Sequence, residues 1–129
     1  MHWSETYIGK PYRLGDADCA ALCIDVIENE FTGQVPDFCK TYRENTRLKR
    51  AEQLEQLAKQ ATVQTDNPVE GDVVLMLCRG RPSHVGIYCL ANNEPSVLHA
   101  MENVKMVVLH RIRDLPRYFL AVEGYYKWN

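Results

Sequence analysis

The second half of the chain constrains the fold most strongly, because it consists of short apolar segments separated by tight turns. Clusters of Gly, Pro and Asn separate the first four segments, and each segment is rich in Val, Leu, Ile or Tyr. Strands joined by such short connections pair antiparallel, since a parallel pair needs a crossover of about a dozen residues or more. We therefore predict a sheet from strands at 73–77, 85–91, 96–100, 104–111 and about 119–127.

The first half of the chain carries helical patterns instead. From residue 18 to about residue 31, the apolar residues Leu22, Val26 and Ile27 recur at helical spacing, and a stretch with Gly and Pro follows them. A second helix is predicted over about 46–61, where charged residues surround a narrow apolar stripe. We interpret those charges as a solvated helix face.

Length and composition indicate one ordinary globular domain. The chain has 129 residues, of which 46% are hydrophobic and 25% charged. We predict a single α+β domain over residues 1–129, with N-terminal helices packed on a curled antiparallel sheet of about five strands. The formal net charge of -2 gives no reason to expect a nucleic acid or an anionic membrane as partner.

Cysteine usage argues against a disulfide framework and against a metal site. The five cysteines, at positions 19, 23, 39, 78 and 89, are odd in number and show no paired spacing, which favours a reducing compartment. With the four histidines they form neither a CxxC nor an HxxxH pattern, so we expect no metal and no cofactor. The N-terminus lacks a cationic start followed by a long apolar stretch, so we expect synthesis in the cytoplasm without a signal peptide.

Cys19 is the strongest candidate for a reactive residue. In GKPYRLGDADCAALCIDVIE, turn-forming residues give way to the helical pattern at Cys19, which places its thiol in the first turn. Unpaired backbone N–H groups and the positive end of the helix dipole stabilise a thiolate there. His84 in SHVGIYC and His99 in VLHA lie in predicted strands and are suited to act as a base and its orienting partner.

The strand that begins at His84 has two different faces. Strand alternation puts His84, Gly86 and Tyr88 on one face, opposite the face of Val85 and Ile87. Because Gly86 has no side chain, we expect it to let the Cys19 helix approach the sheet closely beside His84.

Four segments together resemble a known family. GKPYRLGDADCAALCIDV, GDVVLM, SHVGIYC and VLHA occur in the same order as in the NlpC-type papain-like cysteine peptidases of bacterial cell walls and phage tails. The resemblance covers about residues 7 to 112 and implies a papain-like fold. It implies a cysteine peptidase that cuts peptidoglycan stem peptides, commonly between D-glutamate and a diamino acid.

The resemblance also implies roles for individual residues. Cys19 is the expected nucleophile, His84 the general base and His99 the residue that orients the His84 ring. The expected substrate-binding residues are Tyr12, Asp18 and Ser83. Asp18 is expected to recognise the free amino terminus of a peptide. The family usually has Ser-Gly directly after the nucleophile, whereas this chain has Ala20 and Ala21. A hydroxyl group is therefore absent from the expected substrate cleft.

Other functions stay open at this point. The same fold serves thiol amidases and acyltransferases, and a non-catalytic tail or structural protein could keep it as a scaffold. The cell-wall hydrolase implied by the resemblance is either a bacterial enzyme or a phage tail component. A small single domain favours delivery by a phage tail, with phage tail proteins as partners, or by another secretion device. The remaining candidate side chains are interpreted as core packing, structural or surface residues: Cys23, Cys39, Cys78, Cys89, His2 and His110.

Overall fold

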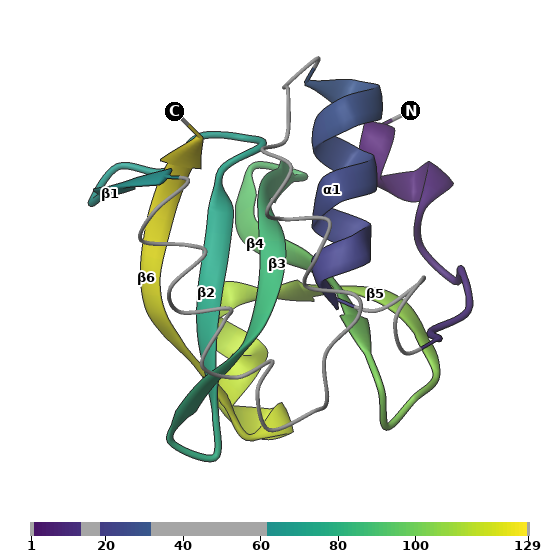
Figure 1. Ribbon diagram of the computed structural model, residues 1–129, viewed down its shortest axis with the longest axis vertical. Helices are drawn as coiled ribbons and strands as arrows, with labels where there is room; N and C mark the ends of the chain where they lie inside the picture. The colour runs from purple at the N-terminus through teal and green to yellow at the C-terminus, as the bar shows by residue number, and fades with distance from the viewer. Residues whose placement is uncertain (1, 14–18, 32–61, 129) are drawn as a thin grey trace.

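The computed structural model describes residues 2–13, 19–31 and 62–128 (Figure 1). Two short 3₁₀ helices, one α-helix and six strands occur in these ranges. In chain order they are η1 (Trp3–Thr6), α1 (Cys19–Glu30), β1 (Thr62–Thr65), β2 (Val73–Cys78), β3 (Arg81–Ala91), β4 (Glu94–Met101), β5 (Met106–Arg111), η3 (Ile112–Tyr118) and β6 (Leu120–Trp128). The helix predicted over about 46–61 lies outside the described residues.

The strands form one antiparallel sheet in the order β1-β6-β2-β3-β4-β5. The five predicted strands are confirmed as β2 to β6, with shifts of a few residues at their ends. Tight turns at Arg79-Gly80 and Asn92-Asn93 have positive φ at both residues, which matches the right-handed twist of the strands that they join. The strand β3 begins at Arg81, directly after the first of these turns and four residues before the predicted start at residue 85.

Three elements were missed by the sequence patterns, namely the 3₁₀ helices η1 and η3 and the strand β1. The strand β1 has only four residues and pairs with the distant β6, so it carries little local signal. The 3₁₀ helix η3 contains Pro116 and lies between two strands that the sequence pattern joined directly. Its Leu115 side chain is buried.

The sheet is covered on both faces, and each face has its own apolar cluster. On one face, α1 packs against β3 and β4, which lie beside it in Figure 1. This contact buries Val26 and Ile27 of the helix with Ile87 and Leu98 of the strands. Full burial of one such aliphatic side chain contributes about 1.5–3 kcal/mol to the free energy of unfolding.

The opposite face carries a smaller apolar cluster beneath η3. Its members come from β2, β3, β4, η3 and β6: Val74, Met76, Tyr88, Val97, Leu115 and Leu120. The alternation predicted for β3 is confirmed, since Val85 and Ile87 belong to the α1 cluster while Tyr88 belongs to the η3 cluster.

The N-terminal segment covers the open edge of β5. Backbone hydrogen bonds join Gly9 and Lys10 to Val107, and the N–H of Tyr12 donates to the carbonyl of Lys105. The paired part of this edge, at residues 105–107, cannot recruit a strand from another molecule. No helix in the described ranges is long and apolar enough to cross a membrane.

Candidate active site

Three histidines form a row across three neighbouring strands. Nε2 of His84 on β3 lies 2.7 Å from Nδ1 of His99 on β4. Nε2 of His99 in turn lies 3.0 Å from Nδ1 of His110 on β5. The strands are antiparallel neighbours, so three side chains on the same face come within hydrogen-bond distance at this register. His99, in the middle of the row, is fully buried.

Gly86 makes room for this row and not for the helix. A Cβ atom at Gly86 would lie 2.5 Å from Cγ2 of Val97, 2.7 Å from the carbonyl oxygen of Leu98 and 3.0 Å from Cβ of His99. All three atoms belong to β4. The expectation that Gly86 lets the Cys19 helix approach is therefore wrong, because α1 packs on the other face, over Val85 and Ile87.

Burial keeps the histidines of the row neutral at pH 7. Removal from water lowers the pKa of His84 to about 4. Burial also holds the pKa of His99 well below its usual value, and positive charge on His84 or His110 would lower it further. The pKa of His110 is lowered by burial as well, although the Asp114 carboxylate acts in the opposite direction. A neutral His84 has a lone pair with which to accept a proton.

Nδ1 is the nitrogen of His84 that can accept a proton. Nε2 of this ring is engaged by His99, whereas no hydrogen bond within the described part of the chain engages Nδ1. A catalytic imidazole exchanges a proton at one ring nitrogen while a hydrogen bond at the other nitrogen holds the ring in place.

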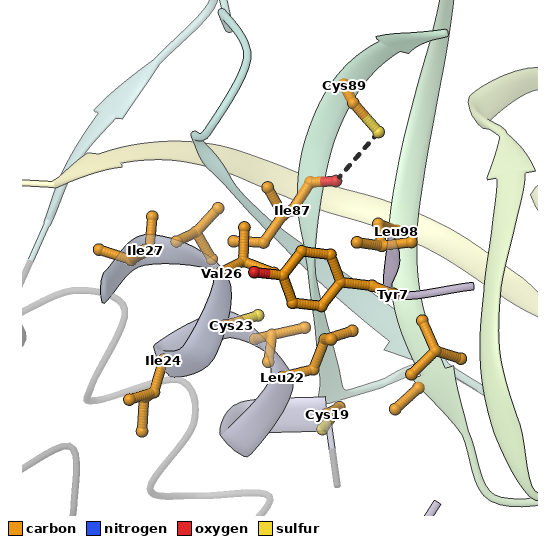
Figure 2. Packing of buried hydrophobic residues seen from close by; sticks show 14 of the residues in the cluster. Tyr7, Cys19, Leu22, Cys23, Ile24, Val26, Ile27, Ile87, Cys89 and Leu98 are labelled. Atoms are coloured by element: carbon orange, nitrogen blue, oxygen red, sulfur yellow. Dashed lines mark hydrogen bonds between the residues drawn. The ribbon is translucent and has the colours of Figure 1, made fainter. Parts of the chain in front are cut away.

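Cys19 is the first residue of α1, as the sequence predicted. Figure 2 shows it at the beginning of the helix, with Leu22 and Cys23 following. Its side chain is 7% exposed and belongs to the apolar cluster between α1 and the sheet. The helix packs on β3 and β4 from the sheet face of Val85 and Ile87, which is opposite to the face that carries the histidine row.

The expected substrate-binding residues are only partly placed by the structure. Tyr12 is partly buried and packs against the α1 cluster, beside the start of β5. Asp18 lies outside the described residues, and the side chain of Ser83 is likewise not described, although its backbone is part of β3.

His110 is the site residue that sequence reasoning missed. It was interpreted as a structural or surface residue, whereas its ring hydrogen-bonds His99 and stacks on Tyr118 with centroids 3.9 Å apart and planes 11° apart. His110 could have been predicted from the strand register, because its pairing with Val97 places it on the same sheet face as its diagonal neighbour His99. That register is a property of the folded sheet.

The other thiols and histidine have structural surroundings. Cys23 and Cys89 are buried in the α1 cluster, and burial raises the pKa of the Cys89 thiol to about 12, which makes it inert as a nucleophile. Cys78 is partly exposed at the end of β2, and Cys39 lies outside the described residues. The His2 ring contacts the Glu70 carboxylate and is not part of the histidine row. Within the described ranges, no cluster of His, Cys, Asp and Glu has the form of a metal site.

Comparison with known proteins confirms the family resemblance. The NlpC/P60 family model matches residues 9–118, which is most of the chain. Searches of curated proteins and of solved structures returned no match. The α+β arrangement, with a helix packed on an antiparallel sheet, agrees with the papain-like fold of this family. The chain therefore belongs to the NlpC/P60 family, which implies a cysteine peptidase that hydrolyses peptidoglycan.

Proposed function

We propose that Cys19, His84 and His99 form the catalytic triad of this peptidase. The observation that carries the proposal is the hydrogen bond between Nε2 of His84 and Nδ1 of His99. It orients the His84 ring through one nitrogen and leaves Nδ1 to accept the thiol proton. Because burial lowers the pKa of His84 to about 4, this base is neutral at pH 7, and it is also a weaker proton acceptor than an exposed histidine.

The proposal requires the Cys19 thiol to reach His84 from the N-terminal end of α1. The body of the helix packs on Val85 and Ile87, whose side chains alternate with that of His84 along β3. Cys19 is the first residue of α1, but its side chain belongs to the apolar cluster between the helix and the sheet, so the approach requires the thiol to leave that cluster. The same position stabilises a thiolate through the positive end of the helix dipole.

The reaction follows from these roles in two steps. Sγ of Cys19 attacks the peptide carbonyl carbon while its proton passes to Nδ1 of His84. The C–N bond breaks as His84 returns that proton to the leaving amine, and a thioester remains. Water then attacks the thioester carbonyl and gives a proton to His84, the C–S bond breaks, and the thiolate recovers its proton from His84. A backbone N–H at the helix start stabilises the oxyanion, and one such donor contributes about 3 kcal/mol to catalysis.

We assign the bond between D-glutamate and a diamino acid of the stem peptide as the substrate. Asp18 directly precedes the nucleophile, where a carboxylate would attract the free amino terminus of a peptide. Ser83 directly precedes the base, and Tyr12 packs beside the α1 cluster. These three residues are therefore assigned to the substrate side of the site. Association with a phage tail stays a prediction from the resemblance.

Mass spectrometry of defined peptidoglycan fragments tests the proposal. The wild-type protein should cut the stem peptide at one bond, and Cys19→Ala should abolish the cut. Cys78→Ala is the matched control, because Cys78 is a partly exposed thiol at the far end of β2 and should leave cleavage unchanged. The mass of the fragments locates the bond.

Three results would contradict the proposal, each in a different way. Cleavage that survives in Cys19→Ala would remove the nucleophile assignment. A cut elsewhere in the stem peptide would keep the triad and overturn the substrate bond. No cleavage by the wild-type protein would favour an amidase or acyltransferase if Cys19 still reacts with iodoacetamide, and a non-catalytic scaffold if it does not.

A further inference from the structure

We propose that His110 is a positioning residue, which fixes the tautomer of His99 and, through it, the tautomer in which His84 can act as a base. The catalytic part of this inference rests on the proposed function, whereas the tautomers are a property of the folded protein. The inference begins from the two hydrogen bonds of His99, which involve both of its ring nitrogens.

The two hydrogen bonds are coupled because His99 is buried and neutral. A neutral imidazole has one N–H and one lone pair, so it donates at one nitrogen and accepts at the other. With His99 fully buried, an unpaired nitrogen would carry a desolvation cost, and both bonds must therefore run in the same direction along the row. The row has only two possible polarities.

Only one polarity leaves His84 able to accept a proton. If Nε2–H of His99 donates to Nδ1 of His110, then Nδ1 of His99 accepts from Nε2–H of His84, and the lone pair of His84 is at Nδ1. In the opposite polarity, His84 carries its proton at Nδ1 and cannot take the proton of the Cys19 thiol. An acceptor at Nδ1 of His110 would therefore select the active tautomer of His84, with His99 between the two rings.

The surroundings of His110 hold its ring in the orientation that this role needs. The ring stacks on Tyr118 of η3, which restrains rotation about the side-chain bonds. The backbone of His110 pairs with Val97 of β4, beside the strand position of His99. The Asp114 carboxylate favours the protonated form of the His110 ring, but burial outweighs it and lowers the pKa of His110, so the neutral ring keeps a lone pair for the hydrogen bond with His99. Asp114 is itself held by a 2.7 Å hydrogen bond from Nε of Arg111.

Long-range ¹H–¹⁵N NMR of the imidazole rings tests this inference without any substrate. Protonated and lone-pair nitrogens of a neutral imidazole have well-separated ¹⁵N shifts, so each ring reports its tautomer. In the wild-type protein at pH 7, we expect His84 and His99 to carry their protons at Nε2. A proton at Nδ1 of either ring would overturn the inference, and this measurement needs no variant.

Two substitutions at His110 separate the hydrogen bond from packing. His110→Leu removes the acceptor, so the signals of His99 and His84 should change to mixed tautomers. His110→Asn places an amide oxygen near the position of Nδ1 and should restore the wild-type pattern. His2→Gln is the control, because His2 contacts Glu70 and is not part of the row. Unchanged tautomers in His110→Leu, or no rescue by His110→Asn in a folded protein, would overturn the inference.

Kinetics then connect the tautomers to the reaction. We expect His110→Leu to lower kcat about tenfold, which corresponds to about 1.4 kcal/mol, and to change KM by less than about twofold. His110→Asn should recover most of kcat. A loss confined to KM would contradict the positioning role. If the wild-type protein cuts no peptide, the proposed function fails while the NMR measurement still decides the role of His110.

Discussion

Gly86 and His99 face each other across the β3–β4 ladder so closely that a Cβ atom at Gly86 would lie 3.0 Å from Cβ of His99. The same Cβ would lie 2.5 Å from Cγ2 of Val97 and 2.7 Å from the backbone oxygen of Leu98, which cannot move aside as a flexible side chain can. The missing side chain at Gly86 is therefore what allows His99 to sit beside His84.

Gly86→Ala should destabilise the protein and disturb the histidine row together. Forcing a methyl group into a packed site costs about 1–3 kcal/mol, and here the displaced neighbour is the residue that orients His84. Urea unfolding measures the first effect and peptide cleavage the second. Gly124→Ala is the comparison, since its Cβ would meet the flexible end of Gln64 at 2.9 Å. Equal losses in the two variants would contradict this account of Gly86.

Cys19 should be the most reactive described thiol. Its place at the helix start favours the thiolate, whereas burial raises the pKa of Cys89 to about 12. We expect iodoacetamide to modify Cys19 at a pH well below that needed for Cys78, and His84→Ala to slow the modification. Peptide mapping by mass spectrometry identifies the modified thiol at each pH. Equal reactivity of Cys19 and Cys78 would remove the nucleophile assignment.

Stability should fall as the pH is lowered from about 6.5 to about 4. The folded protein holds His84 neutral with a pKa of about 4, and burial also lowers the pKa values of His99 and His110. The unfolded chain takes up these protons near pH 6.5, so acid favours unfolding across that window, and the stabilisation is complete only above it.

Urea unfolding at pH 7 and pH 4 measures this loss. We expect the partly exposed His84 to contribute about 1–2 kcal/mol to the loss of unfolding free energy between pH 7 and pH 4, after allowance for solvent screening. His84→Gln keeps a polar side chain without a titrating group and should lose less stability over the same range. A variant that loses as much as the wild-type protein would show that other groups control the acid response.

Glu70→Gln should weaken the attachment of the N-terminal segment. Oε1 of Glu70 accepts hydrogen bonds from the His2 ring and, at 3.0 Å, from the backbone N–H of Leu90, while Trp3 donates to Oε2. Burial alone would raise the pKa of this carboxyl group, but the hydrogen bonds outweigh it and lower the pKa. The stabilisation is therefore present above the usual glutamate pKa and is lost as the pH falls through the lowered value.

We expect Glu70→Gln to lower the free energy of unfolding by about 1 kcal/mol at pH 7. The difference from the wild-type protein should shrink as the pH falls through the lowered pKa of Glu70, where the wild-type side chain itself becomes protonated. Glu123→Gln is a suitable control, because its side-chain hydrogen bond to Tyr126 is on β6, away from the N-terminal segment. A pH-independent difference would show that the charge of Glu70 does not hold this segment.

Local patterns were sufficient to predict α1 and the five longer strands. The change from turn residues to helical spacing at Cys19 marks the helix start, and the turn residues between β2 and β5 separate consecutive strands. Each of these signals acts within a few residues of chain. The prediction of Cys19, His84 and His99 as candidates likewise depended on residue type within its own element.

The relationships between elements came only from the folded sheet. β6 lies between β1 and β2, although it is more than 40 positions after both in the chain, and no local pattern specifies that order. The space beside Gly86 is occupied by β4 and not by α1, because the pairing of Ile87 with Leu98 sets which atoms face the glycine.

The sequence by itself determined the helix that carries Cys19 and the antiparallel hairpins that carry His84 and His99. The tertiary structure decided that His110 joins these histidines, that burial keeps them neutral, and that Tyr118 stacks on the end of the row. The physical reason is that hydrogen bonds and desolvation depend on distances across strands. Those distances are set by the register and the packing of both sheet faces, which involve residues that are distant in the chain.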